Sequence, residues 1–117
     1  MKEEFVNYEI ALALKELGFD EPCFACVDED GFYLKGDIRF NLVDCVYAPL
    51  YQQAFRWFRE KYGLISYVHP FALLEDTKKW CYEITNFESS WDEDSDLHTL
   101  EEAELACLVK LIGIIKK

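Results

Sequence analysis

The stretch that organises this sequence is residues 49–63, PLYQQAFRWFREKYG. Apolar and aromatic residues recur along it at helical spacing and cover one broad face, while glutamine, arginine and glutamate line the other. Pro49 suits the first helical position, and Gly63 suits the left-handed position just past the helix end. The stretch therefore predicts an amphipathic helix over residues 49–62.

Upstream of this helix the sequence predicts a β-hairpin. Residues 23–27 and 32–35 are short, β-prone and rich in aromatic residues. The residues between them, 28–31, read DEDG, and Asp-Gly between two such runs is typical of a hairpin turn. Residues 36–47 fit either an extension of the sheet or an irregular loop.

Downstream of the helix the sequence predicts two more strands, at residues 64–68 and 80–87. The connection between them, residues 69–79, contains a proline and is long for a hairpin. Residues 89–96 carry four acids and read as a loop.

Each end of the chain predicts a further helix. Residues 3–17 place apolar side chains on one face at helical spacing. Near the other end, Thr99 and Glu102 fit a capping box that opens a helix. Its apolar residues span an arc of about 200° at 3.6 residues per turn, so we expect this helix to be sandwiched inside the fold or shared with another subunit. They are Ala103, Leu105, Cys107, Leu108, Leu111, Ile112, Ile114 and Ile115.

These elements follow the order α-β-β-α-β-β-α. They predict an α+β fold in which a small antiparallel sheet of about four strands packs with three helices. A chain of 117 residues favours a single compact domain over residues 1–117. Its hydrophobic fraction of 51% and aromatic fraction of 16% indicate a packed core.

The charge limits the classes of partner. Lys and Arg number 12 against 23 Asp and Glu, which gives a net charge of −11. This charge disfavours direct electrostatic binding to nucleic acid or to an anionic membrane. An acidic N-terminus, the lack of a long apolar run and an odd count of five cysteines predict a cytoplasmic protein with reduced thiols.

Several cysteine and aspartate residues are of a type that can bind metal ions, but their pattern does not match a complete metal site. Cys23 and Cys26 form a CxxC, but positions i and i+3 of a strand point to opposite faces, which favours structural thiols. Asp28, Asp30 and Asp37 do not match a calcium loop, because Cys26 falls at its first ligand position.

The recurring motifs of hydrolases, zinc proteases and nucleotide-binding proteins do not occur in the sequence. We therefore assign no catalytic, cofactor-binding or metal-binding residue, expect no cofactor, and predict a protein that is not an enzyme.

The densest cationic spot of this acidic chain is the polar face of the predicted 49–62 helix. Gln52, Gln53, Arg56 and Arg59 lie there, with Lys61 nearby. Arginine can fork onto a carboxylate or phosphate, so these four residues are the candidate interaction surface. The alternative is an ordinary solvated face with weak pairs such as Arg56–Glu60.

Three segments resemble short proteins of gut Bacteroidetes and of their phages or integrated elements. They are residues 13–19 (ALKELGF), 51–64 (YQQAFRWFREKYGL) and 101–108 (EEAELACL). The resemblance implies a small cytoplasmic protein of bacterial or phage origin, and it assigns no activity and no catalytic residue.

Three functions compete. The leading hypothesis is a non-enzymatic accessory or protein-binding module of phage or mobile-element origin, which contacts a host or phage protein and can self-associate through the C-terminal helix. The second is an acidic mimic of nucleic acid, based on the acid runs at 28–30 and 92–96. The third is a small thiol- or metal-dependent enzyme using Cys23, Cys26 or His69.

Overall fold

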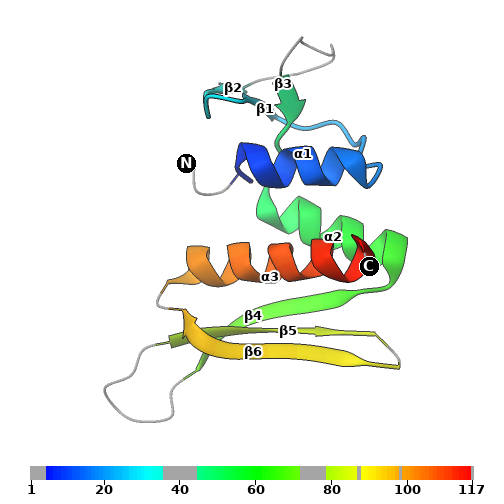
Figure 1. Cartoon of the computed structure of the whole chain (residues 1–117), viewed down its shortest axis with the longest axis vertical. Helices are drawn as coiled ribbons and strands as arrows, with labels where there is room; N and C mark the ends of the chain where they lie inside the picture. Colours follow the sequence, from blue (N-terminus) through cyan, green and yellow to red (C-terminus); the bar gives the residue numbers. More distant parts are fainter. Residues whose placement is uncertain (1–4, 36–44, 72–78, 87, 98, 117) are drawn as a thin grey trace. The chain divides into compact units, whose positions relative to one another are not determined.

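The computed structural model describes residues 5–35, 45–71, 79–86, 88–97 and 99–116 (Figure 1). Within these residues the elements run in the order α1-β1-β2-β3-α2-β4-β5-β6-α3. The chain divides into two compact units, Met1–Ala54 and Phe55–Lys117, with the boundary inside α2. That residues 1–117 form one cooperative domain remains a prediction.

The first unit begins with α1 (Tyr8–Glu16). The helix starts later than the sequence predicted, because Asn7 has an extended backbone and caps it. The Asn7 side-chain oxygen accepts a hydrogen bond from the amide of Ile10 at 2.9 Å, which satisfies one of the free amides of the first turn. Ile10, Ala11 and Leu14 are buried on one side of the helix.

The sheet of the first unit has the order β2-β1-β3 and is antiparallel throughout. Strands β1 (Ala25–Asp28) and β2 (Tyr33–Lys35) confirm the predicted hairpin, although β1 begins two residues later than predicted and leaves Cys23 before the strand. The ambiguous stretch 36–47 contributes β3 (Cys45–Tyr47) on the other side of β1, and its residues 36–44 lie outside the described chain. Helix α1 packs against β1 and β3.

A single side chain closes the β1–β2 turn. One carboxylate oxygen of Asp28 accepts hydrogen bonds from the amides of Asp30 at 3.0 Å and Phe32 at 2.9 Å. Gly31 has φ of 86°, a left-handed conformation that L side chains rarely adopt. Asp28 and Asp30 therefore serve a turn, which agrees with their failure to match a calcium loop, while Asp37 lies outside the described residues.

The predicted central helix is confirmed as α2 (Tyr51–Tyr62), although it begins two residues after Pro49. Its apolar face is buried through Tyr51, Ala54, Trp57 and Phe58. Gly63 has φ of 70° and ends the helix as expected.

The second unit contains a sheet of order β4-β5-β6, again antiparallel. Strand β4 (Ile65–Phe71) extends three residues beyond its predicted end and includes Pro70. Proline has no amide hydrogen to donate, and β4 tolerates it as an outer strand. Strand β5 (Lys79–Thr85) pairs with β4 along its whole length.

The predicted loop at 89–96 is wrong, since β6 (Ser90–Leu97) is a strand. Acidic residues are rare in strands, but strand preference depends strongly on context. Pairing with β5, as between Trp91 and Ile84, overrides the local composition.

Helix α3 (Leu100–Lys116) packs on this second sheet (Figure 1). The predicted cap is present, because the Thr99 hydroxyl oxygen accepts from the amide of Glu102 at 3.1 Å. Five residues of its apolar arc are buried, while Leu105, Ile114 and Ile115 are half-buried. The buried ones are Ala103, Cys107, Leu108, Leu111 and Ile112.

The structure confirms the α+β class, the antiparallel pairing and the three helices. It differs in the number and grouping of strands, because β3 and β6 each add a third strand to a predicted pair. The result is two three-stranded sheets instead of one sheet of about four strands. None of the helices described has the length and hydropathy needed to cross a membrane.

Candidate functional site

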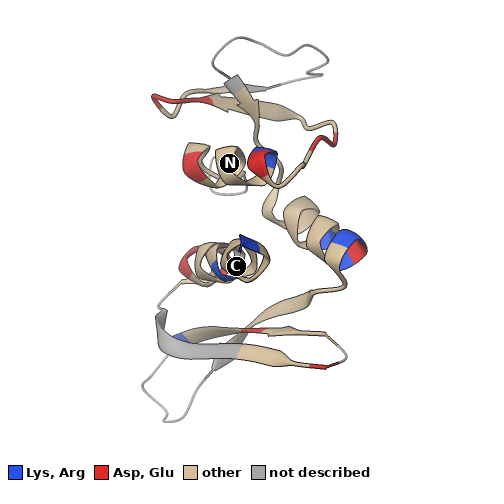
Figure 2. Ribbon diagram, turned by 45° about the vertical axis from the view of Figure 1, so that its right-hand side comes forward, with Lys and Arg blue, Asp and Glu red and all other residues tan. Residues whose placement is uncertain are grey.

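The candidate interaction surface lies on α2, opposite the buried aromatic face. Gln52, Arg56 and Arg59 follow one another at i, i+4 and i+7, so they form one stripe along the helix. All three are exposed. Figure 2 shows that Lys and Arg gather toward the C-terminal end of this helix.

Gln53 has a different role from the other three. Its side-chain amide donates to a carboxylate oxygen of Glu21 at 3.2 Å and to the carbonyl oxygen of Pro22 at 3.1 Å. It therefore fastens the start of α2 to the segment that leads into β1, within the first unit. We call Gln52, Arg56 and Arg59 the α2 stripe, and Gln53 supports it.

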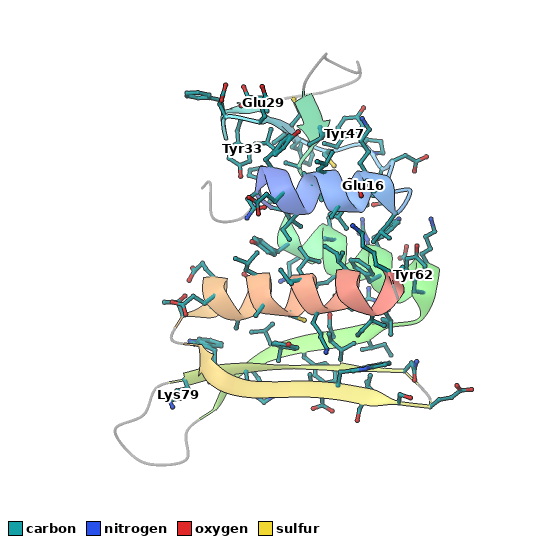
Figure 3. All side chains as sticks on the ribbon, in the orientation of Figure 1. Glu16, Glu29, Tyr33, Tyr47, Tyr62 and Lys79 are labelled. Carbon is teal, nitrogen blue, oxygen red and sulfur yellow. The ribbon has the colours of Figure 1, made fainter. Side chains whose placement is uncertain are left out.

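An aromatic cluster fixes the last turns of α2. The Trp57 ring meets Phe58 and Tyr62 edge to face, with centroids 5.1 Å and 5.5 Å apart. The ammonium group of Lys61 lies 5.0 Å from the Trp57 ring centre and 5.6 Å from that of Tyr62, which Figure 3 labels. Cation–π contacts of this kind hold Lys61 to the helix.

The helix dipole of α2 explains the position of two of its basic residues. Arg59 and Lys61 lie in the last turn of α2, where positive charge is favoured by the partial negative charge of the helix end. Arg56 lies before the last turn, and this reason does not cover it.

The CxxC cysteines are buried and unlinked. The Cys23 thiol donates to the carbonyl oxygen of Glu21 at 3.3 Å. Burial raises the pKa of Cys23 to about 12, and the nearby Glu21 charge adds to this effect. Cys26 lies within β1, opposite Leu34 and Tyr47. Cys23 is therefore a protonated structural thiol at neutral pH.

The residues described contain no group of three or more His, Cys, Asp or Glu side chains placed to hold a metal ion. The nucleic-acid-mimic hypothesis is based on two runs of acidic residues. In the run at 28–30, a carboxylate oxygen of Asp28 is engaged in hydrogen bonds within its own turn. The side chains of 92–96 lie outside the description.

The structure brings together one pair that sequence reasoning missed. His69 and Cys81 are opposite each other in the β4–β5 register. The Cys81 sulfur lies 3.4 Å from Nε2 and 3.5 Å from Nδ1 of His69. His69 was considered in the third hypothesis with Cys23 and Cys26, but its neighbour is a different thiol. The predicted strand at 64–68 stops one residue before His69, and the pairing further depends on the register between β4 and β5.

In the second unit Cys107 completes the set of described thiols. It is fully buried on α3, and this burial raises the pKa of its thiol to about 12. A hydrogen bond with the Ser66 side chain acts in the opposite direction and is the smaller effect. That hydrogen bond also shows which face of β4 meets the helix. The Ser66 side chain points toward α3. Because successive side chains of a strand point to opposite faces, the odd-numbered residues of β4, including His69, lie on the other face of the sheet.

Comparison with known proteins returned no match to a family model, a curated protein or a solved structure.

Proposed function

We propose that this protein is a non-enzymatic accessory module that binds an acidic surface of a partner protein through the α2 stripe. The observation that carries the proposal is the position of Arg56 and Arg59, which are exposed one turn apart on a helix whose opposite face is buried. Their backbone is fixed before a partner arrives, which lowers the entropy cost of binding.

The chemistry of the stripe favours a carboxylate-bearing protein over nucleic acid. Arginine presents a planar fork that can bind a carboxylate through two parallel hydrogen bonds. Two arginines neutralise few phosphates, and a net charge of −11 opposes association with a long polyanion. Salt screens the repulsion of more distant acids beyond about 8 Å, so a local contact with acidic side chains stays favourable.

The proposed setting comes from the resemblance to proteins of gut Bacteroidetes and their phages. We propose a cytoplasmic protein of phage or mobile-element origin, whose partner is a host or phage protein. Self-association through α3 is a second part of the proposal, supported by the three apolar residues of its arc that remain half-buried. Sedimentation of the purified chain tests it, and a monomer at high concentration would reject it.

The test of the α2 stripe is a comparison of charge-reversed variants. The immobilised protein captures its partner from a lysate of a gut Bacteroidetes host, and the double variant Arg56→Glu/Arg59→Glu is run beside it. The control, Lys15→Glu/Lys110→Glu, makes the same change in net charge at exposed lysines of α1 and α3.

We expect the wild type and the control to retain the same protein and the arginine variant to lose it. With that protein purified, calorimetry should show at least a tenfold weaker Kd for the arginine variant, about 1.4 kcal/mol. Equal losses in both double variants, or no retained protein, would contradict the proposal.

A further inference from the structure

The His69–Cys81 pair joins a nucleophile to a base across two strands. The sulfur lies 3.4 Å from Nε2 of the imidazole ring. The two residues are direct neighbours in an antiparallel ladder, so the backbone of both strands holds them together.

The His69 ring makes a second contact, with a backbone carbonyl group, which fixes its tautomer. Nδ1 of His69 lies 3.2 Å from the carbonyl oxygen of Pro70. A carbonyl oxygen can only accept, so Nδ1 carries the hydrogen in this contact and Nε2 of the neutral ring has its lone pair free. The sulfur is almost equally far from the two nitrogens, so it lies over the face of the ring, and the ring must turn away from Pro70 before Nε2 points at the thiol. A thiol and an imidazole that serves as its base once the ring has turned therefore lie side by side.

The Cys81 thiol also donates to the carbonyl oxygen of His69 at 3.7 Å, so it differs from the other thiols only in having an imidazole beside it as well. Cys23 faces a carbonyl oxygen near a carboxylate, and Cys107 faces the hydroxyl of Ser66. Burial raises the pKa of both to about 12, so neither forms appreciable thiolate at neutral pH. Among the described cysteines, Cys81 is the one shown with an imidazole within reach.

The ring of His69 is one of the groups that cover the Cys81 sulfur. The pair lies on the sheet face opposite α3, and Cys81 is 7% exposed whereas His69 is exposed. Exposed side chains change rotamer in picoseconds to nanoseconds, so movement of the ring uncovers more of the sulfur. Lys79 and Glu83 flank Cys81 on the same face of β5, and Figure 3 labels Lys79 at the start of this strand.

We propose that Cys81, with His69 as proton acceptor, is a thiol-exchange site for small organic disulfides. The thiol proton passes to Nε2, and the thiolate attacks one sulfur of the small disulfide. The disulfide bond of the small molecule breaks as the new one to Cys81 forms. The departing thiolate takes the proton from His69. Cys81 is oxidised to a mixed disulfide, one sulfur of the small molecule is reduced to a thiol, and excess thiol reverses the exchange.

The test uses hydroxyethyl disulfide, an uncharged probe that the acidic chain does not repel. Intact mass and peptide mapping of the folded protein should show a first adduct at Cys81, with Cys23 and Cys107 unmodified. In urea all five cysteines should react, which shows that the probe is competent. A first adduct at any other cysteine, or no adduct on the folded chain, would overturn the proposal.

Substitution of His69 distinguishes two roles of its ring, which are to accept the thiol proton and to shield the sulfur. If the ring only shields the sulfur, His69→Ala accelerates the reaction; if it accepts the proton, the same change slows it. We expect a slowing of about tenfold, below what a fully positioned general base contributes, because the ring must first turn toward the thiol.

The matched control is Tyr67→Ala, an exposed residue two positions earlier on the same face of β4, and its rate should equal that of the wild type. Faster reaction of His69→Ala would reject the role of His69 as base. Far-UV circular dichroism verifies that the variants are folded.

Discussion

The two units build the same kind of sheet from very different strands. In the first unit the strands have 4, 3 and 3 residues, and in the second they have 7, 7 and 8. The short sheet depends on a side-chain-closed turn and on β1, where Ala25, Cys26 and Val27 are all buried. The long sheet carries its proline and its run of acids on the outer strands β4 and β6, and the register of β6 on β5 shifts between Trp80 and Tyr82. Outer strands therefore accept irregular sequence that a central strand does not.

The largest effects should come from matched truncations in the two cores. Leu14 of α1 and Leu111 of α3 are both fully buried. Changing either to alanine should cost about 2–5 kcal/mol in the free energy of unfolding, because each leaves a cavity. Since α2 crosses the boundary between the units, we expect both changes to shift one common urea transition.

Fluorescence tells the two units apart. All three tryptophans, Trp57, Trp80 and Trp91, belong to the second unit. Leu14→Ala should therefore move the fluorescence transition as far as the circular dichroism transition. A fluorescence midpoint that stays at its wild-type value would break the single-domain prediction and show that the units unfold separately.

Smaller effects should come from the two capped helices. Asn7 caps α1 and Thr99 caps α3, each through one side-chain oxygen bonded to an amide of the first turn. Alanine at either position should destabilise the protein by about 1 kcal/mol, measured by urea unfolding.

Serine at Asn7 and aspartate at Thr99 are the controls, since both retain a capping oxygen and should keep most of the stability. If alanine and the capping replacement cost the same at either site, the hydrogen bond contributes nothing there.

The smallest effect at neutral pH concerns the protonated thiols, one in each unit. Cys23 and Cys107 have a pKa raised from 9.0 to about 12 in the folded chain. Their contribution to stability is fully present below pH 9.0 and is lost as the pH rises toward about 12, because only the unfolded thiols ionise in that window.

Cys23→Ala and Cys107→Ala should each flatten the decline in stability above pH 9.0, measured as urea midpoints against pH. The same variants at pH 7 supply the control, because the thiols are neutral in both states there and the difference reflects packing alone. An unchanged slope above pH 9.0 would contradict the assignment.

The sequence predicts those parts of the fold that are determined by residues close together in the chain. The α2 helix follows from its apolar period and from Gly63, and the β1–β2 hairpin follows from the DEDG turn. Strand β6 escapes such reasoning, because its composition favours a loop and only pairing with β5 makes it a strand. The start of α1 was missed because Asn7, as cap, outweighs the apolar residues before it.

The candidate site also has a part that can be predicted from local sequence and a part that depends on distant contacts. The α2 stripe can be predicted, since it needs only helical spacing. Gln53 belongs to that face by sequence, but its bonds to Glu21 and Pro22 depend on a contact more than thirty residues away in the chain. The His69–Cys81 pair depends on strand register, which composition does not reveal across a connection of this length.

The two outer strands of the second sheet have a consequence for the behaviour of the protein in concentrated solution. An outer strand is a template on which another chain can add, and natural sheets discourage this with proline and charge. Strand β4 carries Pro70, and four of the eight residues of β6 are acidic. The acidic stretch that looks like a loop by composition is therefore an outer strand, and its charges oppose the addition of another chain at that edge.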